Sequence, residues 1–378
     1  MNDPGIERDL PRDHTWHTPV SRRTLFALMG GSAVLAACSG GSAKAPDTTA
    51  ADTSSSSSST TSTSSTSTTA APTTTTEPPP VQPLTGRPLT DETLLQRPAV
   101  IVKISNDRRA RPQTGLMEAD IVFEAWGAGP TRFAAVFHST DAEFVGPIRS
   151  CREQDVNLLG EFNRAVFACS GGNKGNLALL RNSDMLLVTE GKGPGWRLDP
   201  NRNRPHKTRA DTAQLRTNAD PDRTAPADQF HYRAADAPAT QGNPMTGFDL
   251  QIQSVFVQWR YDEASSTYLR QQDDRPHVMD NGDVVSTNNV VVLWLDYEPS
   301  STDRRSPDGR STGTGGAVVF TGGRMILGSW TRKDRLDPFT LTTADGEPVL
   351  LAPGRTFIEL PNSGNGSFRG NDVFTAVA

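Results

Sequence analysis

The chain of 378 residues has few cysteines, few aromatic residues and no apolar run that could cross a membrane. Three cysteines are too few for a disulfide-rich scaffold. The apolar stretch at residues 25–37 is shorter than the roughly 20 residues that a spanning helix needs. A formal net charge of -5 gives no basic footprint, so we expect no nucleic-acid partner.

The sequence also lacks the short motifs of common enzymes. It contains no H-E-x-x-H pair, nucleophile elbow, Walker loop or dinucleotide fingerprint. The histidines and cysteines do not have the spacing of metal ligands. We therefore expect neither a metal nor a cofactor, and the assignment of an enzyme class stays open.

The first 38 residues have the layout of an export signal. The pair Arg22-Arg23 precedes the apolar stretch, and small residues lead to Cys38. This order is typical of a twin-arginine lipoprotein signal peptide, residues 1–37, which is removed so that Cys38 carries the lipid, including palmitate. The alternative is an ordinary signal peptide with an incidental cysteine. The first interpretation places the protein outside the cytoplasm, anchored by lipid to the outer face of the cell membrane.

Residues 38–82 are predicted to be the lipidated cysteine followed by a disordered tether. They consist almost entirely of Ser, Thr, Ala and Pro, with an unbroken serine run at 54–59. Such a composition offers no apolar surface to offset the entropy of ordering the chain. The tether would hold the remaining domains at a distance from the membrane.

Residues 83–220 alternate between strand and helix patterns. Strands are predicted at 98–104, 121–126, 132–138 and 164–170, and helices at 148–162, 176–181 and 210–217. Such alternation predicts a layered α/β domain.

Prolines interrupt the pattern at 221–246, which we interpret as a connecting loop before a β domain at 247–378. Turn signals there separate predicted strands at 248–259, 267–270, 288–296, 317–320, 324–330, 339–341 and 356–360. The overall fold class is therefore α+β, with a mainly antiparallel sheet in the second domain.

Besides Cys38, the chain has Cys151 and Cys169. In an exported protein an even pair favours a disulfide. Two buried free thiols are the main alternative, and a Cys169 nucleophile is a weaker one because no histidine and acid accompany it.

Several motifs resemble those of one family, the YerB-like lipoproteins that carry domain of unknown function 3048. The motifs are Arg111-Pro112-Gln113-Thr114-Gly115-Leu116, Ala119-Asp120-Ile121-Val122-Phe123-Glu124, Thr131-Arg132-Phe133, Gly146-Pro147-Ile148-Arg149-Ser150-Cys151-Arg152 and Pro205-His206. The resemblance continues through Trp259-Arg260-Tyr261-Asp262 and Gly328-Ser329-Trp330. It implies a two-part extracytoplasmic protein on a lipid anchor, and it implies no particular activity. Cys151 and Lys207 depart from the family pattern, in which a small residue and Asn are usual.

The same motifs supply the candidate ligand-binding residues. The cations are Arg111, Arg132, Arg149 and Arg152, accompanied by Gln113 and Ser150. Guanidinium groups beside a helix amino terminus, predicted here near residue 149, bind carboxylate or phosphate. We expect the four arginines to line one pocket because strand and helix ends converge on one rim.

Asp120 and Glu124 allow a different interpretation of these arginines. The two acids are predicted to pair with Arg132 and Arg149 as internal ion pairs that fix the domain. The patterns alone do not choose between this interpretation and anion binding.

His206 lies in a polar loop, where a general base would face solvent. It supports an alternative function, a cell-envelope hydrolase or transferase in which His206 acts with Asp120 or Glu124. A lone loop histidine is more often structural.

A glycan platform is a weaker possibility in the second domain. It would consist of Trp259, Tyr261, Tyr268 and Trp330, with Asp262 and Arg270 as polar partners, although aromatics at alternate strand positions usually serve packing. An open sheet edge would equally accept a partner strand. The preferred function is binding of an envelope component, either a protein or an anionic or glycan polymer of the cell wall.

Overall fold

The computed structural model describes residues 80–368 and 372–378. The predicted signal peptide, Cys38 and the tether up to residue 79 lie outside the described residues.

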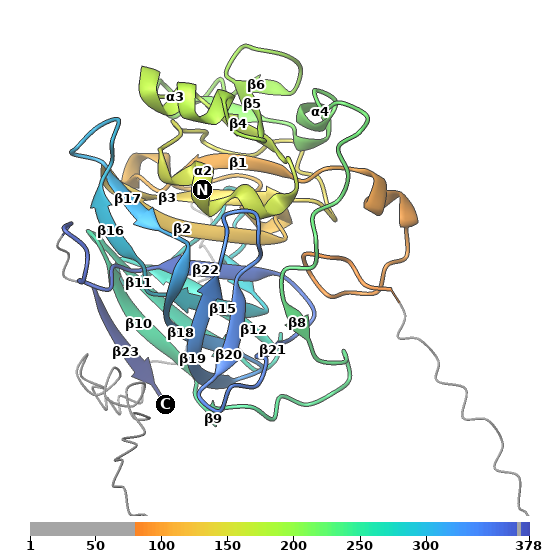
Figure 1. Ribbon diagram of the computed structural model, residues 1–378, viewed down its shortest axis with the longest axis vertical. Helices are drawn as coiled ribbons and strands as arrows, with labels where there is room; N and C mark the ends of the chain where they lie inside the picture. Colours follow the sequence, from red (N-terminus) through yellow and green to blue (C-terminus); the bar gives the residue numbers. More distant parts are fainter. Residues whose placement is uncertain (1–79, 369–371) are drawn as a thin grey trace, which may run out of the picture.

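An 11-stranded sheet runs through the whole described molecule (Figure 1). Its order is β20 (Thr340–Thr343), β19 (Arg324–Arg332), β18 (Gly313–Thr321), β15 (Asn289–Leu293), β22 (Thr356–Leu360), β2 (Ile121–Gly127), β3 (Gly129–Phe137), β1 (Val100–Ser105), β4 (Val166–Cys169) and β5 (Leu186–Thr189), with β9 (Asn243–Pro244) on β19. Strands from before and after residues 221–246 therefore belong to one sheet.

The strand β22 joins the two parts of this sheet. It pairs in parallel with β2 on one side and with β15 on the other. In the first pairing Val122 lies opposite Phe357 and Glu124 opposite Glu359. The backbone hydrogen bonds of the sheet thus pass directly from the first region to the second.

A six-stranded sheet covers one face of the second region. It contains β13 (Arg275–Pro276), β12 (Thr267–Gln272), β11 (Val255–Asp262), β10 (Gly247–Ile252) and β23 (Val373–Val377), with β14 (Ser286–Thr287) on β12. Phe248 of β10 stacks on Phe320 of β18 with ring centroids 4.6 Å apart, and Trp259 of β11 lies 5.0 Å from Phe357 of β22. These contacts show that the two sheets pack face to face.

The remaining elements are short. Short strands form three two-stranded sheets: β16 (Asp296–Pro299) with β17 (Pro307–Arg310), β21 (Leu350–Leu351) with β8 (His231–Tyr232), and β6 (Trp196–Leu198) with β7 (Thr208–Ala210). The α-helices of the described residues are α2 (Gln154–Leu158), α3 (Lys174–Arg181) and α4 (Thr212–Arg216). Single 3-10 turns are η1 (Glu92–Gln96), η2 (Arg108–Ala110), η3 (Leu116–Glu118) and η4 (Gly160–Phe162). The fold is β-rich, and its few helices are shorter than a layered α/β domain would lead one to expect.

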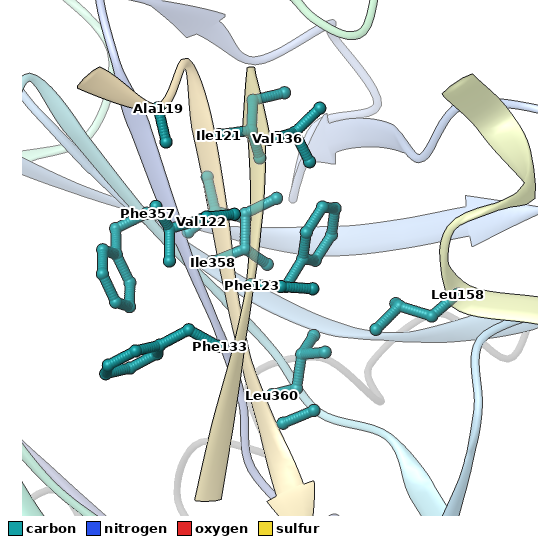
Figure 2. Close-up of a cluster of buried hydrophobic side chains, with 14 of the residues drawn as sticks. Ala119, Ile121, Val122, Phe123, Phe133, Val136, Leu158, Phe357, Ile358 and Leu360 are labelled. Carbon is teal, nitrogen blue, oxygen red and sulfur yellow. The ribbon is translucent and has the colours of Figure 1, made fainter. Parts of the chain in front are cut away.

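The core around β2 and β22 is apolar on both faces of the sheet (Figure 2). Phe133 and Phe357 meet edge to face on one side, with centroids 5.8 Å apart. On the other side Phe123 contacts Phe162 at 6.0 Å. A strand buried on both faces has a continuous apolar sequence, and this explains the unbroken run at residues 121–123.

The sequence located most strands, but two of its elements were wrong. The helix predicted at 148–162 is reduced to α2 and η4, because residues 149–151 form hydrogen bonds to β1 and to the residues just after β4 instead. The strand predicted at 248–259 is the hairpin of β10 and β11, which turns at Gln253 with a φ of 55°.

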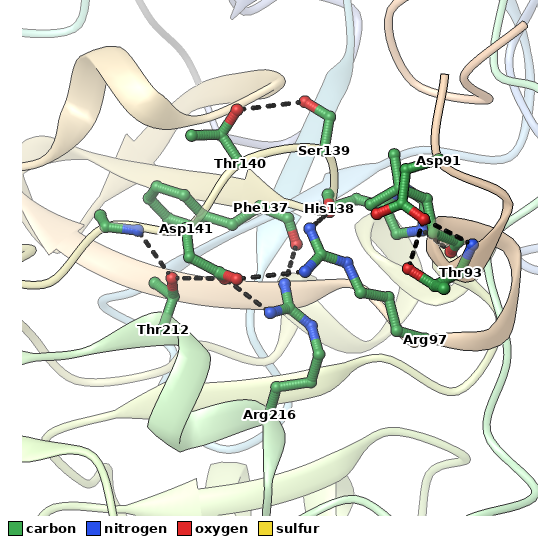
Figure 3. Close-up of polar contacts among 12 residues, drawn as sticks. Asp91, Thr93, Arg97, Phe137, His138, Ser139, Thr140, Asp141, Thr212 and Arg216 are labelled. Carbon is green, nitrogen blue, oxygen red and sulfur yellow. Dashed lines mark hydrogen bonds and ion pairs between the residues drawn. The ribbon is translucent and has the colours of Figure 1, made fainter. Parts of the chain in front are cut away.

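An ion-pair network fastens α4 to the end of β3 (Figure 3). The Asp141 carboxylate accepts hydrogen bonds from Arg216 at 2.5 Å, from Thr212 at 2.8 Å and from Arg97 at 3.2 Å. Arg97 also donates to the carbonyl oxygen of His138. Segments far apart in sequence are thereby held at one end of the first region.

Candidate anion-binding site

The candidate site lies where β1 and β4 separate. These parallel strands pair from Val100 to Val102, and beyond that point the segment of Arg149 and Ser150 enters between them. The Arg149 amide donates to the Lys103 carbonyl at 2.8 Å, and the Arg149 carbonyl accepts from the amide of Ser170, just after β4, at 3.0 Å. The carboxyl ends of parallel strands are common places for ligand sites.

Three arginines gather at this point, and we call Arg132, Arg149 and Arg152 the arginine cluster. Burial, followed by the charges of Arg152 and Arg149, lowers the pKa of Arg132 to about 9. Burial is the largest cause that lowers the pKa of Arg152, and the positive charge of Arg149 lowers it further. The three guanidinium groups therefore lie close enough to repel one another.

The carboxylate nearest the cluster already has partners. Asp155 accepts from the Lys103 ammonium at 2.6 Å and from the Arg152 amide at 2.7 Å. Lys103 and Asp155 form a fully buried ion pair whose charges offset each other. Asp303 also raises the pKa of Arg152, but it is itself paired with Arg305, so the cluster keeps an excess of positive charge.

Hydrogen bonds to carbonyl oxygens orient two members of the cluster. Arg132 Nη1 donates to the Ser150 carbonyl at 3.2 Å, and Arg152 Nη1 donates to the Cys151 carbonyl at 2.8 Å. The Arg149 guanidinium has no hydrogen bond or ion pair within the described residues, and its Nε is buried. Arg149 is thus the member of the cluster whose hydrogen-bond donors are most available to a ligand.

The cluster does not lie at a helix start, as the sequence had predicted. The helix α2 begins at Gln154 and is five residues long. The Asp155 carboxylate binds the amide of Arg152 and occupies the space that an anion at this helix end would need. Any anion must therefore be held by the guanidinium groups themselves.

His206 lies near Arg149 of the cluster. Burial, followed by the charge of Arg149, lowers the pKa of His206, so its imidazole is neutral at neutral pH. Its Nε2 lies 3.9 Å from Asp107. The acid beside His206 is therefore Asp107.

Asp120 and Glu124 have other partners than the sequence predicted. Asp120 accepts from the amides of His138 at 2.7 Å and Ser139 at 2.8 Å and from the Ser139 hydroxyl. Glu124 is paired with Arg270 and binds Asn106. The ion pairs predicted with Arg132 and Arg149 are absent from the described contacts of these acids, and neither acid contacts His206, so the geometry does not form the predicted acid/base pair.

A buried polar network connects the two regions. The sequence suggested other roles for its members Arg270 and Glu124, and sequence reasoning missed Gln272, His277 and Glu359. Arg270 binds Glu124, Gln272 at 2.7 Å and His277 at 2.6 Å, and its Nε lies 3.9 Å from Glu359. Burial, and next the charge of Glu124, raises the pKa of Glu359 well above its ordinary value. The alternation in β12, which buries Tyr268, Arg270 and Gln272 on one face, was the available signal.

Arg111 and Gln113 lie apart from the arginine cluster. Arg111 pairs with Asp273 at 3.0 Å, and the buried Gln113 amide donates to the Ser105 carbonyl at 3.0 Å. The structure brings together three of the four predicted arginines and places Arg111 in another cleft.

Cys151 and Cys169 are free, buried thiols. They contact each other: a hydrogen bond from the Cys151 thiol to the Cys169 sulfur raises the pKa of Cys151 and lowers that of Cys169. The disulfide stays a prediction.

The aromatic side chains proposed for glycan binding serve packing. Trp259 and Tyr268 are fully buried and Trp330 nearly so. Trp259 Nε1 donates to Glu359 at 2.9 Å, and Trp330 Nε1 donates to the Trp294 carbonyl at 3.1 Å. Arg270, their predicted polar partner, is buried as well. The four aromatics therefore form no exposed platform for a sugar.

The described residues contain no group of three or more His, Cys, Asp or Glu side chains placed to hold a metal ion. Within this same part of the chain, no helix has the length and apolar character needed to cross a bilayer.

The fold and this site define a class of β-rich proteins with an arginine cluster beside β1. Two domains of one family, described as "Protein of unknown function (DUF3048)", match the chain: the N-terminal domain over residues 84–225 and the C-terminal domain over residues 248–358. The chain belongs to this family, as its motifs predicted.

One curated relative is "Putative lipoprotein YerB" of Bacillus subtilis (strain 168). It is 29% identical over 294 residues, which cover 74% of this chain and 85% of that protein. The crystal structure of the YerB protein from Bacillus subtilis matches with a TM-score of 0.64 at 24% identity, covering 74% of this chain and 96% of that chain. This likeness establishes the shared fold.

Proposed function

We propose that this protein is an exported lipoprotein whose arginine cluster binds an anionic polymer of the cell envelope. The relative named as a lipoprotein supports the anchored location, and the twin-arginine pattern before Cys38 supports export. The outer face of the cell membrane is the location that both features favour.

The observation that most directly supports the binding proposal is the unneutralised positive charge of the arginine cluster. Three guanidinium groups repel one another beside one ion pair that is already complete. Bringing like charges together is unfavourable unless an anion is available to the site. Guanidinium groups present paired donors that match the oxygens of phosphate and carboxylate.

Binding is tested with Arg149→Ala and two polyanions, polyphosphate and polyglutamate. Loss of a charge-assisted hydrogen bond should weaken binding by about 1.5 to 3 kcal/mol while the melting temperature stays near that of the parent protein. The matched control is Arg181→Ala, which removes an exposed arginine at the end of α3. Uncharged dextran distinguishes an anion site from a glycan site.

A structural role of the cluster predicts the reverse result. Arg149→Ala would then leave polyanion affinity unchanged and lower the melting temperature. Equal weakening by Arg181→Ala would show that only the overall charge of the surface matters. Either outcome rejects the proposed site.

The anchor is tested by cell fractionation. Cys38→Ala should move the protein from the membrane to the soluble or unprocessed fraction, and replacing Arg22 and Arg23 by Lys should block export. Unchanged fractionation of both variants would contradict the lipoprotein assignment.

A further inference from the structure

A cleft of about 670 Å³ opens between the two regions, away from the arginine cluster. We call it the Arg111 cleft; it is lined by Arg108, Arg111, Gln272, Asp273, Arg275 and His277, among others. One wall is the loop at residues 108–112 and the other is the hairpin of β12 and β13. Its volume falls in the range of small-molecule sites, roughly 300 to 1,000 Å³.

The loop that forms one wall is held rigidly from behind. Arg202 donates to the carbonyl oxygens of Arg109 at 3.3 Å, Ala110 at 3.2 Å and Pro112 at 2.8 Å. On the cleft side, Arg111 is joined across to Asp273 of the hairpin at 3.0 Å. The walls are therefore preorganised rather than free to collapse on each other.

Two buried donors at this cleft lack acceptors. Arg111 Nε and Gln272 Nε2 are both buried, and neither has a hydrogen-bond partner among the described residues. Gln272 is 2% exposed, so little water reaches its amide. Buried polar groups in folded proteins are usually satisfied, so these two donors keep unused hydrogen-bonding capacity.

The orientation of the Gln272 amide follows from its neighbours. Arg270 can only donate, so Gln272 must present Oε1 to it, at 2.7 Å. Burial, followed by the charge of Arg270, lowers the pKa of His277 well below its ordinary value, so this imidazole is neutral. Its Nδ1 accepts from Arg270 and its Nε2 donates to Gln113 Oε1 at 2.9 Å. His277 therefore offers Gln272 no acceptor, and the amide nitrogen stays unpaired.

The charges of the cleft favour an anion. Arg108, Arg111 and Arg275 supply three positive charges against the one negative charge of Asp273. The part of the lining that carries no charge includes Pro112, Pro276, Val278 and Met279. Val278 is 37% exposed, so an apolar surface remains available to a ligand beside the cations.

We propose that the Arg111 cleft binds an organic oxyanion, a carboxylate or phosphate ester, that carries an apolar substituent. The acidic group accepts hydrogen bonds from Arg111 and Arg108, and the substituent packs on Val278 and the two prolines. This site is separate from the arginine cluster, so the two proposals fail independently.

The test is calorimetric titration of the purified full-length chain with hexanoate, acetate, hexyl phosphate and inorganic phosphate. Hexanoate should bind more tightly than acetate, and hexyl phosphate more tightly than phosphate, because only the longer probes reach the apolar wall. The better of the two hexyl probes identifies the acidic group. Arg111→Ala and Arg108→Ala should each weaken hexyl-probe binding about tenfold or more.

Two further variants make the outcome decisive. Val278→Ser should reduce the advantage of hexanoate over acetate without affecting the fold, because the side chain is exposed. Arg181→Ala lies outside both proposed sites and should leave hexanoate affinity unchanged. The proposal is wrong if the parent, Arg111→Ala and Arg108→Ala proteins bind the hexyl probes with equal affinity. It is also wrong if Arg181→Ala weakens binding as much as Arg111→Ala does, or if none of the probes binds.

Discussion

Arg270 shows how single residues hold the two regions of this protein together. It comes from β12, is fully buried, and pairs with Glu124 of β2, which lies 146 residues earlier. Its guanidinium also faces the rings of Phe133 and Phe357, at 5.5 and 5.4 Å from their centroids. Such a charge is tolerated in the interior only while its partners remain.

Removing one partner should therefore be costly. Glu124→Ala leaves Arg270 buried without its carboxylate and should lower the free energy of unfolding by about 3 to 5 kcal/mol, measured by urea denaturation. The matched control is Asp222→Ala, which breaks the exposed pair with Arg164 and should change stability little. Equal effects of the two variants would show that burial of the pair is unimportant.

His138 should contribute a pH dependence to stability. Burial, followed by the charge of Arg97, lowers the pKa of His138 to about 4 from its ordinary 6.5. The unfolded state therefore binds the proton more readily, so the contribution is complete above pH 6.5 and is lost as the pH falls toward 4. The shift corresponds to about 3 kcal/mol.

The variant His138→Gln tests this, because glutamine can still donate to the Leu94 carbonyl that His138 Nε2 contacts at 2.9 Å. It should flatten the fall in unfolding free energy between pH 6.5 and pH 4. The exposed His231, changed to Gln, serves as the control and should leave the slope unchanged. A parent slope retained in His138→Gln would refute the assignment.

At the scale of elements, local turns and long-range hydrogen bonds both determine where strands end. The hairpin of β12 and β13 turns through Asp273 and Asp274, with φ of 55° and 59°. Two consecutive residues in this region form a type I′ turn, which favours glycine or asparagine. The segment after Gly146 behaves differently, since tertiary hydrogen bonds to β1 and β4 draw Arg149 out of a helix.

The turn predicts opposite effects of two substitutions at one position. Asp274→Gly should raise the melting temperature by relieving up to about 1 kcal/mol of left-handed strain, and Asp274→Val should lower it. Asp273 is left intact because it pairs with Arg111. Thermal melts that rank valine at or above glycine would contradict the turn assignment.

At the scale of the whole molecule, the shared sheet makes the two family domains interdependent. The strand β22 fills the space between β2 and β15, and Trp126 of β2 stacks on Tyr297 with centroids 5.0 Å apart. Without the second region, the edge of β2 and the Glu124 carboxylate would be exposed. An unpaired, apolar edge strand promotes aggregation.

The full chain should therefore unfold in a single cooperative transition, and a fragment of residues 80–246 should not fold stably. Calorimetry and amide NMR dispersion of the fragment provide the measurement. A cooperative transition with native-like dispersion in the fragment would show that the first region is an independent domain.

The sequence by itself determined the family and the approximate place of most strands, because apolar runs such as residues 121–123 mark buried strands wherever they pair. It also identified Arg132, Arg149 and Arg152 as candidates, though not their surroundings. Only the tertiary structure decided that Glu124 pairs with Arg270, that β22 joins two regions into one sheet, and that Arg149 lies between β1 and β4. The physical reason is that local periodicity reports which side chains are buried, whereas ion pairs and sheet order depend on contacts between residues far apart in the sequence.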